Sequence, residues 1–217
     1  MVPRSYFITG TDTGVGKTVL TCRLAREFRT QGLRVAAYKP ACSGAEMVPS
    51  CVPRWSDVES LFAATGGQFD RDRICPQTFL APLSPPAAAA QEDREVDEEL
   101  LLAGYTWLAD RAEIVLVEGA GGFYSPISRN WLNADLAERI GLPVVIVAPN
   151  QLGTINQTLL TIEAVRRRGL DVAGVVLNQI RQLPDESVGT NADEIQRRGR
   201  VEILAELGYG DVGESDV

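Results

Sequence analysis

The sequence contains no histidine, and this absence excludes several classes of catalytic site. Ser-His-Asp triads, Cys-His dyads and histidine-ligated zinc centres all need an imidazole side chain. Any acid–base chemistry must therefore be done by lysine, aspartate or glutamate, or by the substrate itself.

Cysteine is scarce, and its spacing is uninformative. Cys22, Cys42, Cys51 and Cys75 show no C-x-x-C pairing, so we interpret them as reduced structural thiols rather than metal ligands or a redox pair.

Long apolar runs are also missing from the sequence. No run reaches the ~18 residues of a membrane span, and the N-terminus lacks the apolar core of a signal peptide. We therefore predict a soluble, cytoplasmic protein.

Positive charge is in short supply as well. The net charge is -8, the sequence pI is about 4.7, and no basic tract is present. This balance argues against nucleic acid or an anionic membrane as the main partner and favours a small molecule. With 217 residues, of which 45% are hydrophobic, the chain has the size of one domain. We predict that residues 1–210 form this domain and that residues 211–217 are a disordered acidic tail.

Short apolar or β-branched runs alternate with amphipathic stretches along the chain. These runs predict buried strands at residues 6–9, 33–38, 114–117, 143–148 and 172–177. Between them apolar residues recur at helical spacing, as in Leu20, Leu24 and Phe28. The alternation predicts an α/β fold: a single-domain, doubly wound, mostly parallel sheet flanked by helices. In such sheets ligands bind beyond the carboxyl ends of the strands.

The most specific motif follows the first predicted strand. Residues 10–18 are Gly-Thr-Asp-Thr-Gly-Val-Gly-Lys-Thr. In a loop of this kind backbone N–H groups cradle an anion, the lysine neutralises the outer phosphates, and the next hydroxyl can hold Mg²⁺. The usual pattern has four residues between its glycines, whereas Gly10 and Gly16 enclose five. We predict that the loop binds a nucleoside triphosphate and that Lys17 and Thr18 open the first helix.

Charged side chains follow other predicted strands. Glu118 ends the third strand, a position suited to Mg²⁺ beside the phosphate loop. Asp57 offers a second carboxylate if its loop folds back over the site, but locally it is equally a helix N-terminal acid beside a capping Ser56. Lys39 follows the second strand. Taken alone it is compatible with a surface lysine, yet a second lysine near Lys17 is costly unless anionic oxygens lie between them. This arrangement favours phosphoryl transfer.

Together these motifs resemble those of the dethiobiotin synthetase family, whose phosphate loop also has five residues between its glycines. The resemblance covers roughly residues 4–180. It rests on segments in the same order: 10–18, Tyr38-Lys39-Pro40 with Ser43-Gly44, Ser56-Asp57, Leu83-Ser84-Pro85, 117–122, 152–156, and Asn178 after the run 174–177. It implies a P-loop NTPase fold and an ATP- and Mg²⁺-dependent ligase of biotin synthesis. The implied reaction converts 7,8-diaminononanoate and CO₂ to dethiobiotin, through a carbamate and a carbamic-phosphoric anhydride.

The resemblance also implies roles for individual residues. The carbamate and the transferred phosphoryl group are implied to meet Lys17, Lys39, Thr13 and Ser43. The implied Mg²⁺ ligands are Thr18, Asp57 and Glu118. The implied nucleotide contacts are Gly14, Val15, Gly16, Lys17, Thr18, Val19, Glu118, Gly121 and, as the adenine reader, Asn178. Family members are homodimers in which the substrate carboxylate is received across the subunit interface by Gly153, Thr154 and Asn156.

The sequence departs from the family pattern at three places. Gly14 stands where some members have glutamate, and Pro86 stands where histidine is common. Near the adenine the family has a short strand and a turn with proline, whereas here we find only residues 201–204 followed by Gly208-Tyr209-Gly210.

Three alternative interpretations follow from the sequence. Partitioning-type switch ATPases share the loop but carry a signature lysine at the position of Asp12. A cobyrinate-type amidotransferase would need a glutaminase with its cysteine and histidine. A degenerate nucleotide-binding homologue stays open because of the altered C-terminal region.

Overall fold

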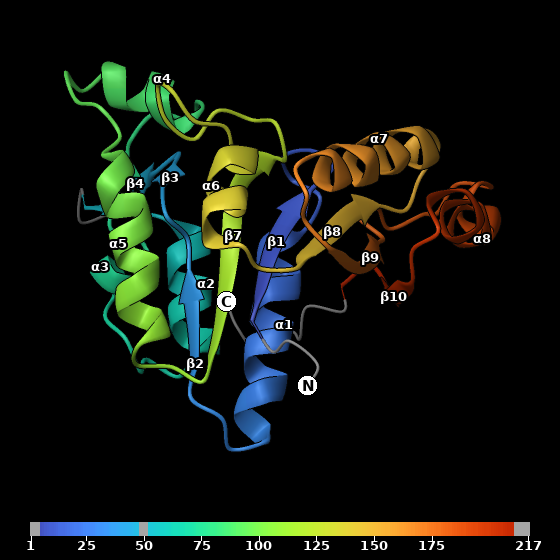
Figure 1. Ribbon diagram of the computed structural model, residues 1–217, viewed down its shortest axis with the longest axis horizontal. Coiled ribbons are helices and arrows are strands. Elements are labelled where there is room, and N and C mark those ends of the chain that lie inside the picture. The colour runs from blue at the N-terminus through green and yellow to red at the C-terminus, as the bar shows by residue number, and fades with distance from the viewer. Residues whose placement is uncertain (1–4, 48–51, 211–217) are drawn as a thin grey trace.

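The computed structural model describes residues 5–47 and 52–210, and a six-stranded sheet runs through its centre (Figure 1). The strands are β1 (Tyr6–Gly10), β2 (Val35–Tyr38), β7 (Ile114–Gly122), β8 (Val144–Pro149), β9 (Val172–Asn178) and β10 (Ile203–Leu207). They lie in the order β10-β9-β8-β1-β7-β2, and every neighbouring pair is parallel. The predicted α/β sheet is confirmed.

Helices cover both faces of this sheet. They are α1 (Lys17–Thr30), α2 (Ser56–Ala64), α3 (Arg71–Ile74), α4 (Pro85–Ala90), α5 (Glu98–Ala109), α6 (Asn133–Ile140), α7 (Thr154–Arg167) and α8 (Val188–Gly199). Successive residues of a strand point to opposite faces, so Phe7 belongs to one buried cluster, with Leu136 of α6, while Ile8 belongs to the other, with Leu61 of α2. Burial on both faces explains why the strands are almost entirely apolar.

The segment between β2 and α2 contains short strands that pair with neighbouring segments. β3 (Cys42–Ser43) pairs in parallel with β6 (Thr78–Phe79), and β4 (Glu46–Met47) pairs antiparallel with β5 (Pro53–Arg54). The backbone N–H of Lys39 donates to Ile74 O at 2.8 Å. These bonds give Lys39 and the residues after it a defined path beyond the end of β2.

The sheet differs from the sequence expectation at two places. β7 continues through residues 118–122, beyond the strand predicted at 114–117, because Gly122 pairs with Gly10 of β1. The C-terminal region forms a longer strand than the four residues expected, since β10 pairs with β9 along Ile203–Leu207.

Three further expectations concern the cysteines, the tail and membrane insertion. Cys22, Cys42 and Cys75 are buried and form no disulfide with one another, as structural thiols should, while Cys51 lies outside the described residues. The predicted disordered tail at 211–217 also lies outside them. Within the described ranges, no helix combines the length and apolar composition needed to cross a membrane.

Candidate active site

The phosphate loop lies between the end of β1 and the start of α1. Helix α1 begins at Lys17, as predicted, and the residue before it, Gly16, has φ of 99°. A Cβ on Gly16 would also collide with the side-chain amide of Asn178, so glycine is needed for both conformation and space. Lys17 Nζ donates to Asp12 O at 3.1 Å, which holds the ammonium group against the loop.

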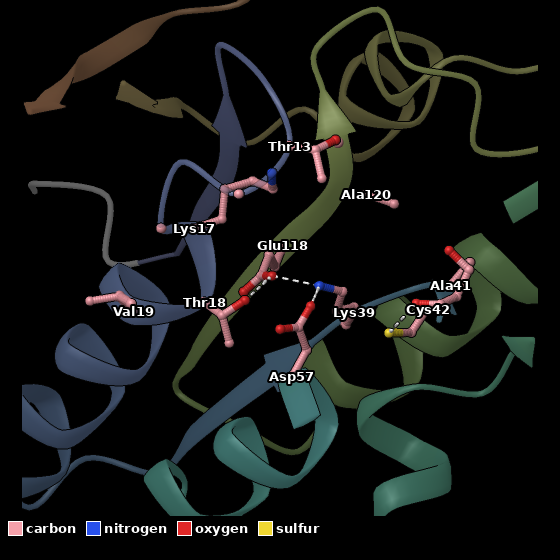
Figure 2. Close-up of a pocket in the computed structure, with 14 residues that line it drawn as sticks. Thr13, Lys17, Thr18, Val19, Lys39, Ala41, Cys42, Asp57, Glu118 and Ala120 are labelled. Carbon is pink, nitrogen blue, oxygen red and sulfur yellow. Dashed lines mark hydrogen bonds and ion pairs between the residues drawn. The ribbon is translucent and has the colours of Figure 1, made fainter. Parts of the chain in front are cut away.

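A cavity of about 410 Å³ opens in front of the loop (Figure 2). Most of the predicted site residues line it, although they come from separate parts of the chain: Thr13, Gly14, Gly16, Lys17, Thr18, Val19, Lys39, Ser43, Asp57, Glu118 and Gly121. They meet because the carboxyl ends of parallel strands lie at one edge of the sheet.

Glu118 is fully buried, and three side chains donate hydrogen bonds to its carboxylate. Thr18 Oγ1 and Lys39 Nζ each lie 2.8 Å from Oε1. Thr21 Oγ1 lies 2.9 Å from Oε2. Because an uncompensated buried charge costs several kcal/mol, these donors are what allow a carboxylate at this point of the sheet.

Lys39 is only 5% exposed, so it is not the surface lysine that its local sequence also allowed. Its ammonium group forms ion pairs with both Glu118 and Asp57 (Figure 2). Burial would lower the pKa of Lys39, but the charges of Glu118 and Asp57 outweigh burial and raise it. Burial likewise would raise the pKa of Asp57, but the charge and hydrogen bond of Lys39 lower it. Lys39 and Asp57 are therefore both charged at neutral pH.

Asp57 is the second residue of α2, and both sequence interpretations of it hold. It is a helix N-terminal acid, and it also reaches the cavity to pair with Lys39. The expectation that Ser56 caps the helix is wrong, because Ser56 is the first helical residue and Trp55 takes the cap position. The Trp55 indole donates to Phe79 O at 2.9 Å, which anchors the start of α2 beside the short strands.

The cavity contains two positively and two negatively charged side chains, and its two lysines lie close enough to interact. Burial lowers the pKa of Lys17; Glu118 acts against this shift and the charge of Lys39 adds to it. Two ammonium groups therefore line one cavity with a partly unfavourable mutual interaction. Phosphate oxygens between them would relieve it.

Several predicted contacts lie outside this cavity. Val15 is buried, and its carbonyl accepts a hydrogen bond from Asn178 Nδ2 at 3.0 Å, so Asn178 contacts the loop backbone without lining the cavity. Gly153, Thr154 and Asn156 are at the start of α7. In the described part of a single chain they do not share a cavity with Lys39.

A second cavity of about 410 Å³ adjoins the first and shares Thr13, Ser43, Ala120 and Gly121 with it. The hydroxyl of Ser43, which lines both cavities, donates to the carbonyl of Leu83 in the second one. The rest of the lining of the second cavity is mostly apolar: Pro82, Leu83, Pro85 and Pro126, with Ser84 and Ser125. Residues 83–85 belong to a motif noted in the sequence, but sequence reasoning assigned them no role in the site.

Sequence reasoning missed Thr21 and one compositional signal. Thr21 lies one turn after Lys17, a spacing that puts both residues on one side of α1.

The compositional signal is the use of lysine. Lys17 and Lys39 are the only lysines in the sequence, and all other basic side chains are arginines. Both lysines line the same cavity, although every other basic side chain in the sequence is arginine.

The oxygen donors of the cavity fit a hard divalent cation. In the structure a cation, the Lys39 ammonium group, already joins the carboxylates of Asp57 and Glu118. Thr18 adds a hydroxyl at the same Glu118 oxygen. Mg²⁺ takes one or two carboxylates and fills its other positions with phosphate oxygens and water. Residues 5–47 and 52–210 contain no group of three or more His, Cys, Asp or Glu side chains placed to hold a metal, so phosphate and water would complete the shell.

Comparison with known proteins places the chain in a family. A family model described as an AAA domain matches residues 4–212. ATP-dependent dethiobiotin synthetase BioD of Anaeromyxobacter dehalogenans (strain 2CP-C) is 48% identical over 204 residues, which cover 94% of this chain and 89% of that protein. ATP-dependent dethiobiotin synthetase BioD 1 of Escherichia coli (strain K12) is 41% identical over 177 residues, or 82% and 78% of the two chains. The chain belongs to the dethiobiotin synthetase family.

The resemblance expected from the ordered motifs is thus confirmed, and the matches do not favour a partitioning-type switch. Rhodopirellula baltica adds a more distant member, 38% identical over 93% of this chain and 83% of its own. Among solved structures, chloroplast FtsY from Physcomitrella patens superposes with a TM-score of 0.51 at 17% identity, over 98% of this chain and 61% of that one. That likeness concerns the fold alone, and it agrees with the predicted P-loop NTPase architecture.

Proposed function

We propose that this protein is a cyclo-ligase that converts 7,8-diaminononanoate, CO₂ and ATP into dethiobiotin, ADP and phosphate. The observation that carries the proposal is the ion-paired Lys39 in the phosphate-loop cavity, directly beside a second, mostly apolar cavity. The first cavity offers the charges that a transferring phosphoryl group needs, and the second offers room for an alkyl chain. Nucleotide binding alone would leave the second cavity without a role. We place the enzyme in the cytoplasm and expect only small-molecule substrates.

In this proposal the triphosphate of ATP binds along the phosphate loop. Free backbone N–H groups and the dipole at the start of α1 favour phosphate there, and Lys17 adds a charge. Asn178 is the proposed adenine reader. Its Nδ2 donates to Val15 O, and its Oδ1 is an acceptor suited to the exocyclic amine of adenine.

The proposed chemistry suits a site without imidazole. One amine of the substrate captures CO₂ as a carbamate. A carbamate oxygen then attacks the γ-phosphorus, ADP leaves, and a carbamic-phosphoric anhydride forms. The second amine attacks the carbonyl carbon, expels phosphate and closes the ureido ring. Lys17, Lys39, Thr13 and Ser43 stabilise the charge that develops on the phosphoryl and carbamate oxygens and hold the reactants in register.

Thr18, Asp57 and Glu118 are the residues that would hold Mg²⁺. When bound, the metal neutralises phosphate charge and orients the phosphoryl group for transfer. In the structure the Lys39 ammonium group pairs with the carboxylates of Asp57 and Glu118. Once those carboxylates serve the metal, the flexible Lys39 side chain is free to turn toward the transferring phosphoryl group.

The second cavity is the proposed place for the alkyl chain of the diamine. The carboxylate at the far end of the substrate would be received by Gly153, Thr154 and Asn156 of a partner subunit in a homodimer. A helix N-terminus favours a carboxylate because its backbone N–H groups are free. Asn156 is exposed on the surface of the single chain, as a residue that serves a neighbouring subunit should be.

The decisive measurement is phosphate release from ATP, Mg²⁺ and bicarbonate with and without 7,8-diaminononanoate. We expect release only with the diamine, accompanied by an equal amount of dethiobiotin, because the carbamate is the phosphoryl acceptor. Phosphate release that does not depend on the diamine would overturn the proposal. Binding of ATP without any turnover would instead identify a degenerate nucleotide-binding homologue.

The carboxylate pocket is tested by Asn156→Ala. Losing one hydrogen bond to a charged group costs about 1.5–3 kcal/mol, so the KM for the diamine should rise about 10–100-fold while the KM for ATP stays within about twofold. Steady-state kinetics with each substrate varied in turn measure both constants. Gln157→Ala, a change at the next exposed residue of α7, is the matched control and should leave both unchanged. Equal increases of the two constants in Asn156→Ala would refute a separate carboxylate pocket.

A further inference from the structure

A continuous series of hydrogen bonds leads from the phosphate loop toward helix α8. It begins at the carbonyl of Val15, which accepts from Asn178 Nδ2 at 3.0 Å. The carbonyl of Asn178, at the end of β9, accepts from the backbone N–H of Asn150 at 2.8 Å. The side-chain oxygen of Asn150 then accepts from Asn191 Nδ2 of α8 at 2.9 Å.

The series continues from Asn191 to the loop before α7. Asn191 Nδ2 also donates to Ser187 Oγ at 3.1 Å, and the Ser187 hydroxyl donates to the carboxylate of Asp185. The other oxygen of Asp185 accepts from the backbone N–H of Leu152 at 2.9 Å. Leu152 directly precedes Gly153, after which α7 begins. The start of α7 is therefore held from the side of α8.

The three asparagines of this series are buried to a degree unusual for the residue type. Asn150 is 5%, Asn178 7% and Asn191 1% exposed. Asn150 is engaged at both ends of its amide, because its Nδ2 donates to Glu206 of β10 at 3.1 Å. Leaving such a buried group without its partner is destabilising, because no water replaces the lost hydrogen bond. The series therefore favours one relative placement of the phosphate loop, the strand ends and the start of α7.

We propose that Asn191 is a positioning residue that links the phosphate loop to the Leu152–Thr154 segment of the same chain, so that nucleotide binding orders this segment. The inference rests on the proposed function, in which that segment receives the substrate carboxylate of the partner subunit. A nucleotide that fixes Val15 and Asn178 also fixes Asn150, and through Asn191 and Asp185 it fixes the backbone of Leu152. ATP bound in one subunit thereby prepares the carboxylate pocket that this subunit offers to the other.

Hydrogen–deuterium exchange tests the link without any measurement of turnover. In the wild-type protein with Mg²⁺ and a non-hydrolysable ATP analogue, exchange of the peptide covering residues 150–156 should slow by about fivefold or more, the lower end of typical coupling between sites. In Asn191→Ala the analogue should still bind, and the slowing should be lost. Equal slowing in the two proteins, or no slowing in the wild type, would overturn the inference.

Ile195→Val is the matched control for packing of α8. Ile195 is fully buried one turn after Asn191, so its truncation loosens the helix without removing a bond of the series. Ile195→Val should keep the nucleotide-dependent slowing of exchange. If Ile195→Val loses the slowing as Asn191→Ala does, the effect comes from a general loosening of α8 and the proposal is refuted. If Asn191→Ala does not fold, Asp185→Ala, a loop substitution that removes the acceptor of Leu152, must show the same loss.

Steady-state kinetics provide the second readout. Asn191→Ala should raise the KM for the diamine about 5–10-fold and leave the KM for ATP within about twofold, because Asn191 acts on the segment through Ser187 and Asp185 and does not line the phosphate-loop cavity. An unchanged KM for the diamine would contradict the proposed role. Failure of the proposed function is distinguishable from failure of this inference. Phosphate release by the wild-type protein tests the proposed function. Nucleotide-dependent slowing of exchange tests this inference, and it can be measured whether or not the diamine stimulates phosphate release.

Discussion

Lys39→Ala is expected to lower the turnover number by about 10²–10³-fold, the usual effect of removing one group that stabilises transition-state charge. The lysine is buried at the centre of the cavity, 2.8 Å from Glu118, and alanine leaves no cation in its place. Lys17 and the phosphate loop remain, so ATP affinity should change only a few-fold. Diamine-dependent phosphate release at saturating substrate concentrations measures the first quantity, and calorimetric titration with an ATP analogue measures the second.

The same substitution removes a partner from two carboxylates, and its effect on stability must be separated from its effect on catalysis. Breaking a buried ion pair costs about 3–5 kcal/mol, so the free variant should melt at a lower temperature. Mg²⁺ with ADP should restore part of the loss, because the metal pairs with the same oxygens. Lys39→Arg keeps the positive charge but places it in a planar guanidinium group. This variant should therefore recover more of the melting temperature than of the turnover number. Near-normal turnover of Lys39→Ala would show that the lysine serves folding alone.

Glu118→Gln is expected to raise the Mg²⁺ concentration needed for half-maximal activity by about 10–100-fold, as loss of a charged group at a metal site does. Glutamine keeps the shape of the side chain and one acceptor oxygen, which can receive either the Thr18 or the Thr21 hydroxyl, and the substitution removes the negative charge. A Mg²⁺ titration of diamine-dependent phosphate release measures the shift. ADP binding with and without Mg²⁺ gives an independent readout, because the metal should strengthen binding less in the variant.

Glu113→Gln is the matched control for this experiment. Glu113 lies directly before the same strand, β7, but it is exposed and accepts a hydrogen bond from the backbone of Arg34 at 2.9 Å. It should leave the Mg²⁺ requirement unchanged. An unchanged requirement in Glu118→Gln as well would contradict the assignment of Glu118 as a metal ligand.

The phosphate loop and most of the sheet were predictable because they depend on short stretches of sequence. Buried parallel strands need continuous apolar runs, and these were found at each of the predicted positions. The loop needs glycine at Gly16, where φ is positive, and a lysine at the first position of the helix. Such requirements are satisfied within a few residues, so they leave a readable local signal.

Lys39 and Asp57 were harder to interpret, because each had two plausible local roles. The segments that carry them are held by short strand pairs, residues 42–43 with 78–79 and residues 46–47 with 53–54. The neighbouring apolar cavity and the bonds among Asn150, Asn178 and Asn191 join residues that are far apart in sequence. Spacing along the chain contains no information about these pairings. The restriction of lysine to positions 17 and 39 was the one signal that could have singled out Lys39.

The amino-acid order was thus sufficient for the fold class, the anion-binding loop and the family, since repeated local patterns specify strands, helices and turns. It was not sufficient for the charge state and partners of the site. The ionisation of Lys39 and Asp57 depends on how far water is excluded and on which charges lie within a few ångströms. Both conditions arise only when β2, β7 and α2 are packed against one another, and this packing makes Lys39 the partner of two carboxylates instead of a solvated lysine.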